Sequence, residues 1–571
     1  MAHPDAALGI GELAMRNTLL LSACAGLAVF VVEAAAISPP ARAQGAAALN
    51  GQIASAKEGP MEGVVVSAKQ ANGIVTVSVV TDHDGRYSFP AKRLAPGHYF
   101  VSIRAEGYEL DGSGVTDVAA GKSTTDDLSL RKAGNLAAQL NDAEWLLSIP
   151  GTEQQKKSLL NCNGCHTLQR IVQSTHTPEE WMPLFDRMAK YCPCSTPSRP
   201  QAMVRPPHGE LPLPVREAMS KFLASINLST KSTWDYPLKT MPRATGKSTH
   251  VIVTEYALPR STIEPHDVVV DKDGIVWFSE FADNALGRLD PKTGKVAEFK
   301  LPRMKEEDPP GTLNLEMGPD GHLWLSLQFQ AAFAEFDRKA LKFVKVWQIP
   351  KDQQDEVSQV GFTSPAASMV DHKVWTRVDT PNSFYRVDLV SMKLDRVGPV
   401  LDPQTHQPLN AYGIPVDREN NLYLLDFGSD KVSRIDAKTL QPTVYHTPTP
   451  GSRPRRGRFD AQDHLWFAEY GANRIAMFDP KAAQFHEYEI PTPWTNPYDV
   501  VADKSGDVWT ASMFTDRVVR LTPETGEFVQ YPLPEQATNI RRVFVDNSGP
   551  RPVFWAGSNH NAGILKVEPL D

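Results

Sequence analysis

The sequence has few features that would place the chain in a membrane or on a nucleic acid. After residue 44, no apolar run is long enough to span a bilayer. The 59 Lys and Arg residues are outnumbered by 67 Asp and Glu residues, and the net charge of −8 argues against nucleic acid or an anionic membrane as the main partner. Motifs for quinone, flavin and nicotinamide cofactors are absent from the sequence, so it does not indicate a complete dehydrogenase.

Cysteine is scarce, with five residues in a chain of 571. Two of them lie in the segment Cys162–His166, which reads Cys-Asn-Gly-Cys-His. This spacing is typical of covalent haem c, in which both thiols add to the vinyl groups and the imidazole of His166 binds the iron. A redox dithiol or half of a zinc site is the alternative, but no second Cys-x-x-Cys is present. Cys192 and Cys194 form either a strained local disulfide or a free pair.

The sixth ligand of the haem iron is predicted to be Met188. It lies on the apolar face of a predicted helix that carries Trp181, and Met/His ligation raises the potential of the iron. The segment from Glu180 to Met188 resembles haem domains fused to bacterial quinoprotein-type dehydrogenases, in which a Met at this place fits an iron ligand. An open iron, with Met188 in the core, is a further alternative. The other candidate ligands are Met203, His176 and His208.

The N-terminus predicts export from the cytoplasm. Arg16 precedes an apolar stretch from Leu19 to Ile37, and the small-x-small sequence Ala41–Ala43 is suited to cleavage. Residues 1–44 are therefore expected to be a signal peptide, and the mature protein is expected in the periplasm or on the outer face of the cell. Lipidation of Cys24 is less favoured, because Cys24 lies in the middle of the apolar run.

Residues 45–132 predict a small β-sandwich with strand-like runs such as Val75–Val80. The pattern from Thr81 to Phe89, Thr-Asp-x-Asp-Gly-x-Tyr-x-Phe, resembles the carboxypeptidase regulatory-like domain. That resemblance implies an accessory domain with no chemistry of its own. Asp82 and Asp84 are a candidate calcium pair, although an Asp-rich turn is more often structural.

Residues 135–228 change to a helical pattern of the size and composition of a small cytochrome c domain. A helix that opens with Thr152-x-x-Gln155 is expected to run into the Cys162–His166 segment. Thr177–Glu180 predicts a capping box with proline at the first helical position. A third helix is expected from Pro214 to Leu228, followed by a linker at residues 229–249.

Residues 250–571 repeat a unit of about forty residues seven times. Four short strands in each unit predict a seven-bladed β-propeller. The last unit has no terminal strand of its own, so Val253–Pro259 is expected to pair with it and close the ring. The counterparts of Trp277 in the other units are Trp324, Trp375, Tyr423, Trp466, Trp509 and Trp555. The predicted fold is therefore mainly β, with an N-terminal β-sandwich, a small α-helical cytochrome c domain and a C-terminal propeller.

The repeat form Asp-x-x-Gly-x-x-Trp-Phe-x-Glu, followed by Asn-x-x-x-Arg, resembles virginiamycin B lyase over about His250 to Leu570. That family opens streptogramin B antibiotics by elimination, with a His as general base and a Glu fourteen residues later that helps to hold Mg²⁺. His266 and Glu280 have this spacing, and the resemblance implies those roles for them. The pairing is chemically reasonable, because elimination needs a base for an acidic C–H and a cation for the enolate.

Two departures argue against lyase activity. The family has a second His in the preceding blade, where this chain has Arg541 and Arg542, which suit an anionic ligand better. An acid also occupies the Glu280 position in two other units, as Asp426 and Glu469, which is also consistent with a structural role in each blade.

Alignment of the units predicts a polar ring at the channel mouth. Polar and aromatic groups around one opening favour a site for a small polar ligand, although a solvated rim without a ligand is the alternative. The predicted mouth residues are His266, Tyr412, Arg455, Tyr498 and Arg541 on the first strands, and Glu280, Asp426 and Glu469 on the second.

Three functions are consistent with this organisation. The first is an exported electron-transfer protein with a redox partner protein, as the haem-bearing part of an oxidoreductase. The second is a lyase with an accessory cytochrome, and the third is a non-catalytic binding or sensing module.

Overall fold

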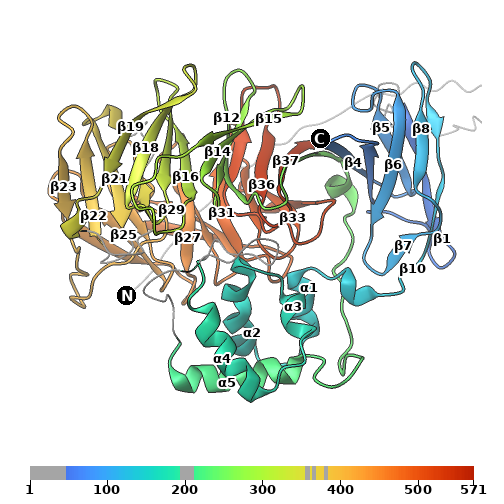
Figure 1. Cartoon of the computed structure of the whole chain (residues 1–571), viewed down its shortest axis with the longest axis horizontal. Coiled ribbons are helices and arrows are strands. Elements are labelled where there is room, and N and C mark those ends of the chain that lie inside the picture. Colours follow the sequence, from blue (N-terminus) through green and yellow to red (C-terminus); the bar gives the residue numbers. More distant parts are fainter. Residues whose placement is uncertain (1–46, 193–202, 204–210, 354–359, 363–367, 379–382) are drawn as a thin grey trace, which may run out of the picture. The chain divides into compact units, whose positions relative to one another are not determined.

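The computed structural model describes residues 47–192, 203, 211–353, 360–362, 368–378 and 383–571 (Figure 1). Strands far outnumber helices among them, which confirms the expected mainly β fold. The predicted signal peptide, with Cys24, lies outside the described residues. No described helix is both long and apolar enough to cross a membrane.

The N-terminal part consists of two sheets that share one apolar core. Leu49 and Ile53 of the first sheet and Val77 and Val79 of the second are buried in the same cluster, as the alternation of side chains along a strand requires. The strands are β1 (Ala47–Ser55), β2 (Gly59–Pro60), β3 (Val65–Gln70), β4 (Val75–Val80), β5 (Arg86–Pro90), β6 (Gly97–Arg104), β7 (Tyr108–Leu110), β8 (Val115–Val118), β9 (Thr124–Thr125) and β10 (Leu128–Lys132).

A helical segment follows. The predicted capping box at Thr177 is present, and the helix that starts after Thr152 also has one. The side chain of Thr152 accepts a hydrogen bond from the backbone of Gln155, and Thr177 accepts one from Glu180. The elements are η1 (Leu136–Ala138), α1 (Asp142–Ser148), α2 (Glu153–Lys157), η2 (Ser158–Gly164), α3 (Leu168–Val172), α4 (Pro178–Met188) and α5 (Leu213–Ile226).

One prediction for this segment was wrong in detail. The helix that opens at Thr152 ends at Lys157, and the cysteine motif begins in the 3₁₀ turns of η2. Asn161, Asn163 and Gly164 are poor helix formers, and the Asn163 side chain makes long-range hydrogen bonds instead.

The rest of the chain forms seven antiparallel sheets in succession, in the manner of a β-propeller. The first strands of most neighbouring sheets pack against one another, and β12 contacts both β16 and β35. A short 3₁₀ helix, η3 (Gly246–Thr249), leads into this part, and η4 (Lys351–Gln353) lies within it. The sheets are β12 (Pro265–Val270) to β13 (Val276–Glu280), β14 (Ala285–Asp290) and β15 (Lys295–Lys300); β16 (Thr312–Met317) to β17 (Leu323–Leu327), β18 (Ala332–Asp337) and β19 (Lys342–Gln348); β20 (Val360–Phe362) to β21 (Lys373–Val378), β22 (Ser383–Asp388) and β23 (Leu394–Val397); β24 (Leu422–Leu425) to β25 (Lys431–Ile435) and β26 (Pro442–His446); β27 (Pro454–Phe459) to β28 (Leu465–Glu469), β29 (Arg474–Asp479) and β30 (Gln484–Glu489); β31 (Pro497–Ala502) to β32 (Val508–Ser512), β33 (Arg517–Thr522) and β34 (Glu527–Pro532); and β35 (Val543–Asp546) to β36 (Val553–Ser558), β37 (Gly563–Pro569) and β11 (Val251–Ala257).

The repeated Asp-x-x-Gly-x-x-Trp motif has a local structural cause. Asp271 closes the turn between β12 and β13 and accepts a hydrogen bond from Trp277 Nε1 at 3.0 Å. Gly274 of that turn has φ +78°, a conformation that favours glycine. The equivalent bonds in two other sheets join Trp466 to Asp460 and Trp509 to Asp503, each at 2.8 Å.

Strand β11 pairs on both of its edges. It pairs with β37 as predicted, from Val251↔Pro569 to Ala257↔Gly563. Its other edge pairs with β4 of the N-terminal part, for example Val253↔Ser78, which the sequence did not predict. The outer edge of the last sheet is therefore covered by the N-terminal part rather than exposed to solvent.

Candidate functional site

Beta-bulges position three of the predicted mouth residues, His266, Arg455 and Tyr498. In β12, the pairing with β13 skips His266 and Asp267, so both residues lie outside the regular ladder. A bulge changes the direction in which side chains point. Here His266 contacts Tyr498, and Asp267 contacts Arg542. The pairing likewise skips Arg455 and Arg456 in β27, and Tyr498 and Asp499 in β31.

A chain of hydrogen bonds joins Asp267 to three of the predicted mouth residues, His266, Tyr498 and Tyr412. His266 Nδ1 lies 2.6 Å from Asp267 Oδ1, and His266 Nε2 lies 3.1 Å from the hydroxyl of Tyr498. The Tyr498 hydroxyl is also hydrogen-bonded to the hydroxyl of Tyr412. His266, Asp267 and Tyr498 are at most 1% exposed, whereas Tyr412 is partly exposed. His266 therefore does not face the mouth directly, and Tyr412 is the accessible end of the chain.

The protonation states follow from the charges around this chain. Burial lowers the pKa of His266 to about 3 despite the nearby Asp267 carboxylate, so its imidazole is neutral. Burial raises the pKa of Asp267, but Arg542 and the bond from His266 lower it by more, so it is ionised. The ionised Asp267 accepts from His266 Nδ1–H, which leaves Nε2 as an acceptor for the Tyr498 hydroxyl.

Arginine side chains surround the two tyrosines. The guanidinium of Arg455 lies 3.9 Å from the ring centroid of Tyr498 and 5.0 Å from that of Tyr412. Arg456 lies over both rings at 5.6 Å. Among the described residues, no carboxylate lies within ion-pair distance of Arg455, whereas Arg456 lies 3.6 Å from Asp267. The site therefore has an excess of buried positive charge.

The cysteine motif contacts this mouth. Asn163, which is 1% exposed, accepts a hydrogen bond from Asn539 Nδ2 at 2.6 Å and donates one to the carbonyl of Met513 at 3.0 Å. The carbonyl of Gly164 accepts one from Arg541 Nη2 at 2.7 Å. The structure thus brings together the two sites that the sequence predicted separately.

Further contacts fix the helical segment on the mouth. The hydroxyl of Tyr470 donates to the carbonyl of Leu160 at 2.8 Å, and Trp145 of α1 shares an apolar cluster with Tyr498 and Phe514. Apolar contact and hydrogen bonds therefore act on the same interface.

A histidine that the sequence analysis did not identify also lies there. His560 follows β36 and lies close to the backbone of Gly164, whose carbonyl Arg541 contacts. Its Nε2 is buried and has no partner among the described residues. The last sheet therefore supplies a histidine to the mouth from the loop after its second strand, and Arg541 and Arg542 come directly before its first strand.

The residues of the motif fit covalent haem c. Cys162 and Cys165 are both thiols, and burial raises the pKa of Cys162 to about 12. His166 Nδ1 lies 3.0 Å from the carbonyl of Thr167, to which it donates, and this bond leaves Nε2 for a metal. A Cβ on Gly164 would meet nothing within 4 Å, so the backbone there is approachable.

The candidate sixth ligands are less buried than the motif. Met188, at the end of α4, is 37% exposed, and Met203 is 46% exposed. His176 packs its ring against Trp181, with centroids 5.1 Å apart, and His208 lies outside the described residues. Met188 and Met203 therefore remain alternatives.

Of the remaining two cysteines in the predicted Cys-Pro-Cys, Cys192 is disulfide-bonded and fully buried, and Cys194 lies outside the described residues.

Glu280 lies opposite Pro265 in the strand pairing, and its carboxylate makes no hydrogen bond to His266 among the described residues. Its carboxylate contacts Arg260 at 3.4 Å, and burial together with Glu298 raises its pKa to about 9. Glu469 repeats this environment, because burial and Glu487 raise its pKa to about 9. Glu280 and His266 share no polar partner among the described residues, so this geometry gives no support to a base–metal pair. Asp426 accepts from Gly428 and Ser429 in a turn.

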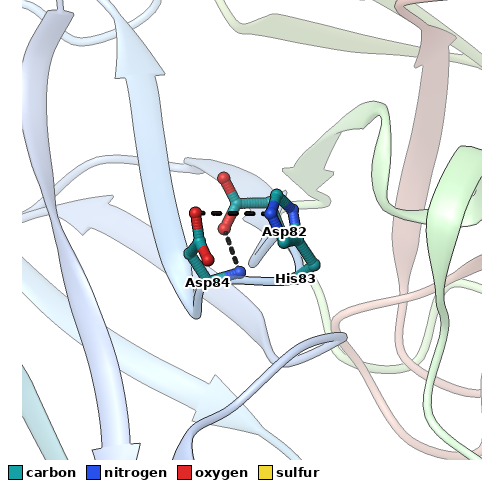
Figure 2. A group of neighbouring side chains, drawn as sticks. All are labelled: Asp82, His83 and Asp84. Carbon is teal, nitrogen blue, oxygen red and sulfur yellow. Dashed lines mark hydrogen bonds and ion pairs between the residues drawn. The ribbon is translucent and has the colours of Figure 1, made fainter. Parts of the chain in front are cut away.

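Two groups of side chains in the described part of the chain have ligand atoms close enough for a metal, and neither includes Glu280. Figure 2 shows the first, Asp82, His83 and Asp84, in the turn before β5. Asp82 Oδ1 accepts from the backbone of Asp84 at 3.0 Å and of Arg86 at 2.9 Å, so its role is that of a turn residue. The second group is Asp320, His322 and Glu335.

Tyr412 lines a cavity of about 500 Å³. Arg456 and Arg542 also line it, whereas His266 and Tyr498 do not. A small ligand at the Tyr412 end of this cavity would meet that residue's hydroxyl and the guanidinium of Arg456, which suits an oxygen anion, although carboxylates also line the cavity. The other polar lining residues include Asn314, Glu316, Asp417, Arg418, Arg458, Asp460, Asp463 and Asp499.

Comparisons with known proteins identify two of the three predicted parts. Residues 403–569 match the Virginiamycin B lyase family, and residues 48–131 match the Carboxypeptidase regulatory-like domain. No curated protein matches the chain.

Similar solved structures include two lyases and a larger assembly. Selenomethionine-substituted virginiamycin B lyase from Staphylococcus aureus is 19% identical with a TM-score of 0.47, and covers 56% of this chain and 100% of its own. A streptogramin B lyase is 18% identical with a TM-score of 0.48, over 57% and 100%. A chain of the mitotic checkpoint complex is 10% identical with a TM-score of 0.43, over 59% and 98%.

Proposed function

We propose that the protein is an exported c-type haem electron-transfer protein whose propeller binds a small polar ligand beside the haem attachment site. In this proposal the seven sheets form a closed seven-bladed ring, residues 135–228 are a cytochrome c domain, and residues 1–44 direct export to the periplasm. A redox partner protein would exchange electrons with the haem.

The observation that carries the proposal is the docking of the cysteine motif on the mouth. Asn163 and Gly164 lie between the two cysteines, and they bond to Asn539 and Arg541. An accessory cytochrome on a free linker would need no such contacts. The ligand site and the attachment site are therefore arranged to work together.

The residues that would hold the haem are Cys162 and Cys165, with His166 bound to the iron through Nε2. When bound, the haem supplies one-electron redox chemistry. Met188 is the proposed sixth ligand, and Met203 is the alternative. The protein's own contribution at the mouth is to exclude water and to concentrate positive charge from Arg455 and Arg541.

The proposal is tested on protein made in a host with cytochrome c maturation. We expect haem staining that survives a denaturing gel and a c-type α band after dithionite. Replacement of both Cys162 and Cys165 by Ala should abolish both signals, whereas His176→Ala should retain the covalent haem. A colourless wild-type protein would contradict the proposal. Any co-purifying small molecule, identified by mass spectrometry, would then be assayed for reduction of the haem.

A Mg²⁺-dependent lyase is the second candidate. It is favoured by the family match over residues 403–569 and by the neutral His266, whose tautomer is held by ionised Asp267 as a general base requires. Against it, Tyr498 occupies His266 Nε2, and Glu280 contacts Arg260.

The lyase is tested by incubation with streptogramin B and Mg²⁺, with detection of the linear product. Turnover that is lost in both His266→Ala and Glu280→Gln would put the lyase first. We expect no useful turnover, because the mouth has an excess of guanidinium groups.

A further inference from the structure

We propose that Tyr412 is the proton-accepting residue of the propeller cavity, and that the arginines around it stabilise its phenolate form. The ligand would be a small oxygen acid or carbon acid whose conjugate base carries its charge on oxygen. This inference rests on the ligand-binding part of the proposed function and is independent of the haem.

Position is the first argument. Of the four residues in the hydrogen-bonded chain from Asp267 to Tyr412, Tyr412 alone lines the cavity. Arg456 lines the same cavity and lies 5.6 Å from the Tyr412 ring centroid. A ligand that loses a proton to Tyr412 would therefore leave its negative charge beside a guanidinium group.

Charge is the second argument. Charged and titratable groups face Tyr412 from several strands, and among the described residues the charged groups that act on it most are arginines. Burial raises the pKa of Tyr412, but Arg455, Arg456 and the hydrogen bond to Tyr498 lower it by more, to about 8. The groups facing it are Arg377 on β21, Arg455 and Arg456 on β27, Tyr470 after β28, Tyr498 on β31 and Arg541 before β35.

Hydrogen bonding is the third argument, because Tyr498 can serve both forms of Tyr412. When Tyr412 is protonated, its hydroxyl donates to Tyr498, and Tyr498 donates to His266 Nε2. When Tyr412 is ionised, the Tyr498 hydroxyl can turn and donate to the phenolate oxygen. Asp267, which fixes the tautomer of His266, and His266 itself are thus positioning residues.

The proton transfer balances without a further reagent. The bond from hydrogen to carbon or oxygen breaks in the ligand, and the O–H bond of Tyr412 forms. The electron pair stays on the ligand as an oxygen anion, which the guanidinium of Arg456 stabilises.

The experiment is an ultraviolet titration of the full-length protein from pH 6.5 to 10, with phenolate absorbance recorded as a difference spectrum at fixed haem oxidation state. We expect one tyrosine with a midpoint near pH 8, a 100-fold stronger acid than the ordinary phenol of pKa 10. Tyr412→Phe should remove this step. The matched control is Tyr488→Phe, since burial raises the pKa of Tyr488.

Two further variants keep the proposal testable if Tyr412→Phe fails to fold. Arg455→Met removes a positive charge without stranding a carboxylate, and Tyr498→Phe removes the donor to the phenolate. Each should move the midpoint upward by at least 0.5 pH unit. In addition, tetranitromethane at pH 8 should nitrate Tyr412 faster than Tyr498, as peptide mapping by mass spectrometry would report.

The proposal is overturned if no tyrosine titrates below its ordinary pKa, or if the step persists in Tyr412→Phe. Equal nitration of Tyr412 and Tyr498 would also overturn it. The haem staining described above uses different variants, so failure of that test and failure of this one are distinguishable.

Discussion

Replacement of Asn539 by Ala should release the helical segment from the propeller mouth. Asn539 is fully buried, and its Nδ2 donates to both the side-chain oxygen and the backbone carbonyl of Asn163, at 2.6 and 3.0 Å. Its Oδ1 accepts from Arg541 Nε at 3.0 Å, and this bond orients the guanidinium that holds Gly164. The variant therefore removes two direct bonds across the interface and loosens a third.

The expected loss of docking free energy follows from these hydrogen bonds. Each buried hydrogen bond contributes about 1 kcal/mol, and an unsatisfied buried partner adds a penalty of about the same size. The docking free energy should fall by about 2–3 kcal/mol, which is about a 30- to 150-fold rise in the population of the opened state. Hydrogen exchange of the amides in α1, η2 and α3 would report this population.

Asn473 provides a matched control. It also has a positive φ, 60° against 49° for Asn539, so both Ala variants carry the same kind of backbone strain. Its Nδ2 also donates two hydrogen bonds, to the carbonyls of Ile490 and Thr492, but both lie within its own sheet and the loop that follows. If Asn473→Ala speeds exchange in the helical segment as much as Asn539→Ala does, the docking argument is wrong.

Three other predictions address stability and ligation. Arg542→Met removes the 2.5 Å bond to the buried Asp267. The free energy of unfolding, measured by urea denaturation, should fall by about 3 kcal/mol, because the Asp267 carboxylate loses its partner. A loss below about 1 kcal/mol would contradict the ion-pair argument. The folded-state pKa of Glu469 is about 9, above its ordinary value of 4.5, so its contribution to stability is full below pH 4.5 and is lost as the pH rises toward 9. Glu469→Gln should therefore make the urea midpoint fall less steeply over this pH range than in the wild type. If the midpoints of the variant and the wild type fall in parallel with pH, this prediction is wrong. Met188→Ala should abolish a weak ferric absorption near ~695 nm and lower the potential. If Met203→Ala does so instead, the ligand is Met203.

The sheet shared between β4 and β11 affects how the chain can be divided. Ile252 of β11 lies in the core cluster of the N-terminal part, and β11 is also the outer strand of the last sheet. Removal of the N-terminal part would expose the edge of β11 and the apolar face that Ile252 covers. The accessory domain expected from the sequence is thus structurally part of the propeller's last sheet.

The sequence by itself determined the features that depend on local interactions. The Asp-x-x-Gly-x-x-Trp repeat is visible because Asp271 closes a turn and bonds Trp277 six residues later. The capping boxes at Thr152 and Thr177 are likewise complete within four residues. The pairing of β11 with β37 could be predicted because the last repeat unit lacks a terminal strand, whereas a strand of that form precedes the first unit.

Only the tertiary structure decided how the site is assembled. Asn163 and Asn539 are 376 residues apart, and the bond between them leaves no periodic signal in either segment. The bulge at His266 and Asp267 is a property of the register between two strands, which aligned repeat units do not show. The repeats therefore predicted His266 at the mouth, whereas in the structure its Nε2 is bonded to Tyr498. The relation of Tyr412 to the cavity and the arginines depends on side chains from separate sheets. Local propensity fixes turns and repeats, whereas burial and charge at the centre of the sheets are set by contacts that no single segment encodes.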